Sequence, residues 1–204
     1  LAPHRPIMPA PALAQRSPKD SEGRYLALLE QLDQAVFRVF ESLKTSGNWD
    51  NTIIVVASDN GGTTRSFPDN LPYAGKKGEF SEGGVRTPLI VYWQGRWEGG
   101  EILDHAVALI DIAPTLLESV PVVPDGGMEG RNLFTTESPR PLFWYHETLN
   151  IRQRGMLSAD GDARLFQIED NPGQLLTEEE FYTGGPNVYD LQPQRVSALE
   201  ALYE

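Results

Sequence analysis

The sequence contains no cysteine, which excludes disulfide bonds, zinc–thiolate sites and thiol nucleophiles together. No apolar run approaches the ~20 residues of a membrane-spanning helix, so we expect no membrane insertion. Basic residues are scarce: 17 Lys and Arg against 29 Asp and Glu give a formal net charge of −12. Nucleic acid is therefore an unsuitable partner, because binding its phosphate backbone requires a basic surface.

The composition is that of a globular protein, with 40% hydrophobic and 23% charged residues. A length of 204 residues suits one compact domain, or a large lobe with a small appendage. No signal peptide is visible, and the chain opens with Leu1-Ala2-Pro3-His4 instead of Met. We interpret this as a start within a larger polypeptide, so the missing signal peptide says nothing about secretion.

The N-terminal region predicts an extended segment followed by a long helix. Four prolines within residues 1–16 exclude a helix there: Pro3, Pro6, Pro9 and Pro11. Ser17-Pro18 predicts a helix start, with Ser17 as the N-cap and Pro18 at the first helical position. Apolar residues then recur every three or four positions over 18–46, which is typical of a helix with one buried stripe. Ser46-Gly47 predicts its end.

Two continuous apolar runs, at residues 52–57 and 88–93, predict strands buried on both faces of a parallel sheet. Residues 63–87 between them predict a long loop. A short helix is predicted over 111–118, with Asp111 as its cap. These elements indicate an α/β lobe.

The remainder predicts a small α+β subdomain. Residues 121–139 are turn-rich and are interpreted as a linker. We then expect antiparallel strands around an Asp160-Gly161 turn and a terminal helix, at 141–146, 155–158, 163–168 and 194–203.

Asp59-Asn60 follow the first predicted strand directly. In open α/β sheets, sites lie at the carboxyl ends of strands. A carboxylate beside an amide oxygen offers two hard ligands, which suits calcium or magnesium. The alternative is that Asp-Asn-Gly-Gly is only a turn signal.

Two other segments carry candidate site residues. Lys76 and Lys77 lie between Gly75 and Gly78, in a loop that can bring an ammonium group close to an anion. The alternative is a solvated loop with two surface lysines. His4 lies between two prolines and could donate a proton to a leaving oxygen, or it is an ordinary loop histidine.

In combination these segments resemble a known family. The order is Pro-His-x-Pro, an amphipathic helix, Asn-Thr-(apolar)-Ser-Asp-Asn-Gly, and then Gly-Lys followed by Glu-Gly-Gly-Val-Arg-x-Pro. It resembles the formylglycine-dependent sulfatases, a branch of the alkaline-phosphatase-like superfamily. Asp111-x-x-Pro114-Thr115 and Val188-Tyr189-Asp190-Leu191 are further landmarks.

The resemblance implies a fold and a division of the chain. Residues 1–125 would be the C-terminal part of an alkaline-phosphatase-like catalytic sandwich. Residues 126–204 would be a small C-terminal subdomain, an antiparallel sheet with a helix.

The resemblance also implies roles for single residues. Asp59 and Asn60 match the calcium ligands of the family, with Mg²⁺ as the alternative ion. Lys77 matches the lysine that contacts the sulfate oxygens, although a shift of one residue would put Lys76 there. His4 matches the histidine that contacts sulfate and is proposed to protonate the leaving alcohol. These groups should converge on one cleft.

Three further residues belong to matched segments. Trp144-Tyr145-His146-Glu147 resembles a segment near the substrate cleft, which implies a substrate-binding role for His146. The alternative is a strand with one exposed face. Glu82 and Arg86 fall within the lysine motif and are assigned to loop structure.

The departures from the family are equally informative. Its nucleophile is a formylglycine made from Cys or Ser in a Cys/Ser-x-Pro-x-Arg motif. Ser66-Phe67-Pro68-Asp69-Asn70 copies three positions but ends in Asn, and we interpret it as a coincidence. The N-terminal aspartates that complete the calcium site have no counterpart before His4. We therefore expect formylglycine in a missing N-terminal half of the same enzyme, which is then the partner of this chain.

The predicted function is hydrolysis of a sulfate ester of a small molecule or sugar by the intact enzyme, with this chain inactive alone. The alternatives are a phosphonate or phosphodiester hydrolase of the same superfamily, and a non-catalytic binding protein derived from the fold. The resemblance implies a periplasmic or secreted location.

Overall fold

The computed structural model describes most of the chain and divides it into two compact units. The described residues are 3–4, 6–63, 70–122, 126–135, 139–147, 152–168, 174–177, 194 and 201. The first unit comprises Leu1–Asn70 and Thr87–Glu101, and the second Leu71–Arg86 and Ile102–Glu204. The predicted domain boundary between residues 125 and 126 stays a prediction. The landmark at 188–191 lies outside the described residues, as does nearly all of the predicted terminal helix.

The first unit begins with two helices, α1 (Pro11–Arg16) and α2 (Ser21–Thr45). The prediction of an extended segment through residue 16 was wrong, because Pro11 starts α1, where the missing N–H costs nothing. Asp20 caps α2 by accepting from the Gly23 N–H at 2.7 Å. Ser17 is not that cap, because its hydroxyl donates to the Leu13 carbonyl at the end of α1. The predicted end of α2 at Ser46-Gly47 is confirmed.

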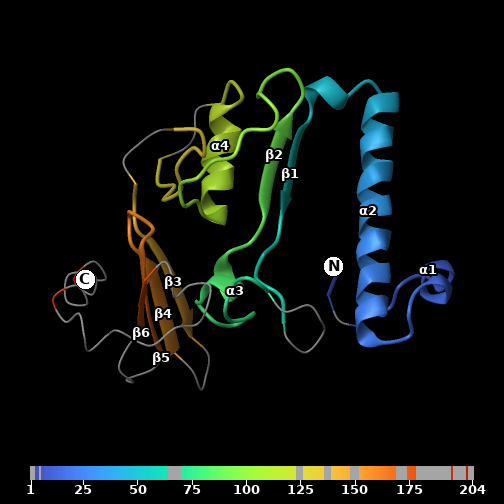
Figure 1. The fold of residues 1–204 in the computed structure, drawn as a ribbon. Coiled ribbons are helices and arrows are strands. Elements are labelled where there is room, and N and C mark those ends of the chain that lie inside the picture. The colour runs from blue at the N-terminus through green and yellow to red at the C-terminus, as the bar shows by residue number, and fades with distance from the viewer. Residues whose placement is uncertain are drawn as a thin grey trace. The chain divides into compact units, whose positions relative to one another are not determined.

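Strands β1 (Ile53–Ala57) and β2 (Leu89–Trp93) form a two-stranded sheet, side by side in Figure 1. Both predicted strands are confirmed, but the predicted parallel pairing was wrong. Ile53 pairs with Trp93 and Ala57 with Leu89, so the strands are antiparallel. An apolar run carries no information on strand direction. Burial on both faces was also wrong among the described residues, because Ile90 is 60% exposed.

Aromatic side chains connect the end of α2 to β2 within this unit. A 3₁₀ turn, η1 (Trp49–Asn51), places Trp49 between Phe40 and Tyr92, with ring centroids 5.4 and 5.5 Å away. The Trp93 indole N–H donates to the Asp50 carbonyl at 3.1 Å. These contacts hold α2 against the edge of the sheet where β1 begins and β2 ends.

The second unit contains a four-stranded antiparallel sheet in the order β3-β4-β5-β6 (Figure 1). Its strands are β3 (Leu142–Glu147), β4 (Arg152–Leu157), β5 (Ala163–Ile168) and β6 (Gln174–Thr177). The antiparallel prediction and the turn at Asp160-Gly161 are confirmed, and Gly161 has φ 79°. Strand β4 starts three residues before the predicted segment, and β6 was not predicted.

Short helices complete this unit: α3 (Glu82–Val85), η2 (Leu109–Asp111) and α4 (Ile112–Glu118). Helix α3 lies within the predicted loop 63–87, so that loop is partly helical. Leu142 and Leu157 of the sheet are buried, and Ala108, Trp144 and Phe166 pack against them. No described helix has the length and apolarity that a membrane crossing requires.

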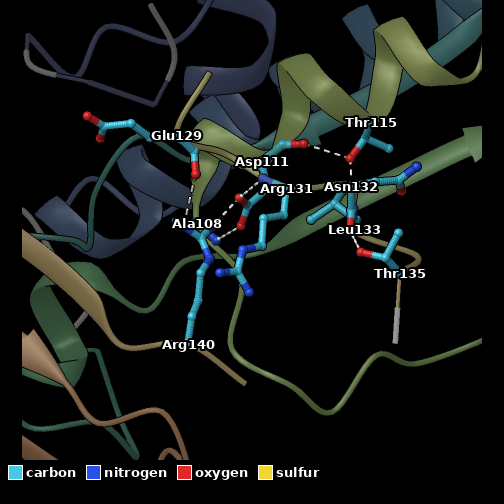
Figure 2. Close-up of polar contacts among 9 residues, drawn as sticks. All are labelled: Ala108, Asp111, Thr115, Glu129, Arg131, Asn132, Leu133, Thr135 and Arg140. Atoms are coloured by element: carbon cyan, nitrogen blue, oxygen red, sulfur yellow. Dashed lines mark hydrogen bonds and ion pairs between the residues drawn. The ribbon is translucent and has the colours of Figure 1, made fainter. Parts of the chain in front are cut away.

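Asp111 organises the segment around α4, as Figure 2 shows. Its carboxylate accepts from the backbone N–H groups of Ala108 and Arg131, each at 2.8 Å, and pairs with Arg140. The Thr115 hydroxyl donates to the Asp111 carbonyl and accepts from the Leu133 N–H. Asp111 is the N-cap residue of α4, as predicted, but its side chain makes no capping hydrogen bond to that helix and instead binds the Arg131 N–H. Together, Asp111 and Thr115 fix residues 131–133. The linker prediction for 121–139 was wrong for these residues, which pack on α4.

Candidate functional site

Asp59 and Asn60 lie in the turn directly after β1. The Ser58 hydroxyl donates to the Asn60 carbonyl, and the Asn60 side-chain amide donates to the Gly61 carbonyl, both at 3.0 Å. The amide of Asn70 closes the turn through two hydrogen bonds to the backbone of Gly62. None of these bonds uses the Asp59 carboxylate, which is exposed. These hydrogen bonds form a turn and leave the Asp59 carboxylate accessible to a cation, so the turn and the metal role are compatible.

The donor chemistry of this turn fits a hard cation in part. The Asp59 carboxylate and the Asn60 side-chain oxygen are the ligand types that Ca²⁺ prefers, and Ca²⁺ takes roughly six to eight oxygens. Among the described residues, no group of three or more His, Asp or Glu side chains could hold a metal ion. Further ligands would have to come from elsewhere, and the metal role of Asp59 and Asn60 stays a prediction.

The two lysines of the second unit differ in their electrostatic surroundings. The Glu79 N–H donates to the Lys76 carbonyl at 3.1 Å, which closes a turn around Lys77. The Lys76 ammonium lies 3.6 Å from the Glu79 carboxylate, which also accepts from the Lys76 N–H. Lys77 is exposed, and no described carboxylate lies within ion-pair distance of its ammonium group. Lys77 is therefore the better placed of the two to bind an external anion.

The glycines after the lysine turn allow close backbone packing. The Gly83 N–H donates to the Ala74 carbonyl at 2.7 Å. A Cβ on Gly83 would overlap the Gly75 carbonyl, and one on Gly84 would overlap the Glu79 carbonyl. Only glycine therefore lets α3 pack against the backbone of the turn that carries Lys77.

Glu82 is buried at the start of α3 and anchors this segment, so it has a structural role, although we assigned it to a loop. Its carboxylate pairs with Arg164 of β5 and accepts from Arg86 at 3.2 Å. The Arg164 guanidinium lies over the Trp144 ring at 5.1 Å. Burial lowers the pKa of Arg164, and the charge of Glu82 opposes this shift. Arg164 was missed from the sequence, because nothing local marks the arginine of one strand as the partner of a glutamate 82 positions earlier.

His146 is exposed on β3, opposite Gln153 of β4. It lies on the same face of the strand as Trp144, because side chains two positions apart share a face. The Trp144 ring lies 6.4 Å from that of Phe80, next to the lysine turn. Within the second unit, His146 therefore belongs to the sheet face that meets residues 76–83, the lysine segment.

His4, like Asp59 and Asn60, belongs to the first unit, and its side chain is exposed. Lys77 and His146 belong to the second unit. The convergence of these residues on one cleft therefore stays a prediction, as do their catalytic and substrate-binding roles.

Comparison with known proteins identifies the relatives of this chain. The family model described as Sulfatase matches residues 2–122. An uncharacterized sulfatase, YdeN, of Escherichia coli strain K12 is 34% identical over 126 residues, which cover 59% of this chain and 22% of YdeN. Human N-acetylgalactosamine-6-sulfatase is 29% identical over 134 residues, covering 60% and 26%. The chain thus spans about a quarter of the length of these relatives.

Solved structures show the same fold. Ps i-CgsB in complex with k-i-k-neocarrahexaose superposes with a TM-score of 0.79 at 22% identity, over 94% of this chain and 45% of that one. The phosphonate monoester hydrolase of Agrobacterium radiobacter gives 0.72 at 20% identity, over 89% and 40%. The predicted alkaline-phosphatase-like fold with a small antiparallel sheet is thereby confirmed. Since the family model covers more than half of its residues, this chain belongs to the sulfatase family.

Proposed function

We propose that this chain supplies one side of the active site of a sulfuric ester hydrolase, in which Lys77 binds the sulfate oxygens. The observation that carries the proposal is the contrast between adjacent lysines. Both lysines are exposed, but Lys76 is paired with Glu79, whereas no described carboxylate lies within ion-pair distance of Lys77, on a turn held against α3. In a chain with net charge −12, such an accessible cation suits an anionic group of a small substrate.

The other candidate residues have complementary roles in this proposal. His4 donates a proton to the leaving alcohol. Asp59 and Asn60 would hold a calcium ion, whose charge would stabilise the sulfate oxygens in the transition state. His146 contacts the alcohol part of the substrate from the sheet face next to the lysine segment. Formylglycine, the nucleophile, would come from the N-terminal half of the enzyme.

Exposed apolar residues of the first unit support a role for that half. Val56 and Ile90 are directly paired across β1 and β2, yet they are 43% and 60% exposed. On α2, Phe37 is 60% exposed. Exposed apolar side chains of this size favour burial against further polypeptide. The N-terminal half of the same enzyme is the partner that this proposal assigns to them.

The proposed substrate class is a sugar sulfate or another small sulfate ester. It is supported by the similarity to N-acetylgalactosamine-6-sulfatase. The second candidate is a phosphonate or phosphodiester hydrolase, which the fold of the phosphonate monoester hydrolase favours. Both reactions use a cation to bind an oxyanion, so the Lys77 environment fits either of them.

The test uses the intact enzyme with its formylglycine, assayed in parallel on an aryl sulfate and an aryl phosphate. We expect the sulfate to be the better substrate and Lys77→Ala to lower kcat/KM by about 100-fold or more. Lys76→Ala, the matched control, should lower it by less than about threefold. A larger loss from Lys76→Ala would shift the assignment by one residue. Preference for the phosphate would favour the second candidate.

A separate measurement tests the metal. Asp59→Ala in the intact enzyme should remove calcium binding in a calorimetric titration and abolish turnover, while the far-ultraviolet circular dichroism stays unchanged. Undiminished calcium affinity in this variant would contradict the assignment. The 204-residue chain alone should not turn over the aryl sulfate, and full activity of that chain would refute the proposed division of the site.

A further inference from the structure

A buried ion pair joins the lysine segment to the sheet of the second unit. Glu82 of α3 and Arg164 of β5 are 4% and 2% exposed. Withdrawing two charges from water costs more free energy than many such pairs return, so stability alone is a weak reason for this one. In some proteins such a pair instead fixes one geometry of the chain.

Arg164 binds the lysine segment at more than one point. One guanidinium nitrogen donates to the Phe80 carbonyl at 3.1 Å, and another donates to the Glu82 carboxylate. Phe80 itself packs over Gly155 of β4, where an added Cβ would come within 2.7 Å of the Phe80 Cβ. Residues 80–82 are therefore held against the sheet by a two-pronged polar contact and by close packing.

The same residues hold the turn that carries Lys77. The turn runs from Lys76 to Glu79, and Phe80 follows it directly. On its other side, the Ala74 carbonyl accepts from the Gly83 N–H at 2.7 Å. Both ends of the turn are thus connected to the segment that Arg164 fixes, so a displacement of that segment would displace the Lys77 backbone.

We propose that Arg164 and Glu82 are a positioning pair that sets where the Lys77 ammonium stands relative to the sulfate group. The kinetic consequence of this inference rests on the proposed function of Lys77. The structural part of the inference, that Arg164 immobilises the turn, does not depend on that function. Arg164 touches no substrate in this account and acts only through the backbone of residues 76–83.

The variant that tests this is Arg164→Lys, which keeps the charge. Lysine lacks the planar fork that lets arginine reach the Phe80 carbonyl and the Glu82 carboxylate together. Glu82→Gln is a second variant of nearly unchanged shape. The matched control is Arg140→Lys, because Arg140 also pairs with a buried carboxylate of the second unit, Asp111, and not with the lysine segment.

The first readout is amide hydrogen exchange in the intact enzyme, which does not depend on activity. The Glu79 and Gly83 N–H groups close the lysine turn and its attachment. We expect them to exchange at least about tenfold faster in Arg164→Lys and Glu82→Gln, and at an unchanged rate in Arg140→Lys. Unchanged exchange in both test variants would overturn the inference, whatever Lys77 does.

The second readout is a double-mutant cycle with Lys77→Ala on the aryl sulfate. Arg164→Lys should lower kcat/KM by about tenfold in the otherwise unaltered enzyme, and by less than about twofold when Lys77 is already alanine. Equal losses in both backgrounds would show that Arg164 does not act through Lys77, and would overturn the positioning role. An active Lys77→Ala enzyme would instead refute the proposed function, and hydrogen exchange would still decide whether Arg164 holds the turn.

Discussion

The two compact units bury their apolar strands to different extents. In the second unit, Met156, Leu142 and Leu165 of the four-stranded sheet are no more than 5% exposed. In the first, Val56 and Ile90 of the two-stranded sheet are 43% and 60% exposed. The strands of the first unit are nevertheless the more continuously apolar in sequence. A two-stranded sheet has too few neighbours to cover both of its faces.

This difference distinguishes two sequence patterns of strands. The mixed pattern of β4 and β5 belongs to a sheet that finds its core within its own unit. The continuous pattern of β1 and β2 is typical of strands covered on both faces. Under the proposed function, the cover for the first unit comes from the N-terminal half of the enzyme. The predictions below test this contrast, from the largest expected effect to the smallest.

The largest effect is expected from truncating a core residue of the second unit. Met156 is fully buried, so Met156→Ala should lower the free energy of unfolding by about 2–5 kcal/mol. Ile90→Ala in the first unit should cost at most about 0.5 kcal/mol in this chain, because the side chain is already largely in water. Urea unfolding followed by circular dichroism measures both. Equal losses would break the contrast between the units.

A second prediction concerns the polar contacts of the second unit. Asp111→Ala leaves Arg140 and two backbone N–H groups without their carboxylate, and should cost about 2–3 kcal/mol. Glu118→Ala removes an exposed partner of the Asn132 side chain and should cost less than about 0.5 kcal/mol. Thermal unfolding of the two variants compares them. Similar melting temperatures would show that the buried carboxylate adds little to stability.

Backbone packing supplies a third prediction. A Cβ on Gly83 would overlap the backbone of Gly75, so Gly83→Ala should cost about 1–3 kcal/mol and displace the lysine turn. Gly99 of the first unit has no atom within 4 Å of such a Cβ, and Gly99→Ala should be neutral within about 0.5 kcal/mol. Chemical shifts of residues 75–85 report the displacement. An unshifted turn in Gly83→Ala would contradict the close packing.

The smallest effect is a change in titration. The Glu147 carboxylate raises the pKa of Tyr145, chiefly by accepting a hydrogen bond from its hydroxyl, whereas burial raises the pKa of Tyr25 in the first unit. Glu147→Ala should return the Tyr145 pKa towards 10.0 and leave that of Tyr25 unchanged. Tyrosine resonances followed against pH measure both. A simultaneous shift of Tyr25 would point to a global change.

The same pair has a defined acid dependence. Hydrogen bonds from Tyr145 and Arg152 lower the pKa of Glu147 below its ordinary 4.5. Its contribution to stability is therefore present above 4.5 and is lost as the pH falls through the lowered value. The group is fully exposed, so the loss should be small. In Glu147→Ala this part of the acid dependence should disappear.

The sequence by itself determined several local elements and the family. The end of α2 at Ser46-Gly47, strands β1 and β2, and the turn at Asp160-Gly161 follow from capping, apolar runs and turn residues. The spacing of the lysine and glycine motifs was sufficient for the family assignment. All of these signals act between residues close together in the chain, so a single sequence contains them.

The tertiary structure alone decided which distant groups meet. It made β1 and β2 antiparallel, turned Lys76 towards Glu79, and placed Arg164 against Glu82. The roles of Asp59, Asn60, His4 and His146 remain predictions from the family resemblance. Pairing direction and buried ion pairs depend on free energies that exist only after remote segments have packed together. Residue type and local spacing do not contain that information, because the partner of a strand or a charge can lie anywhere along the chain.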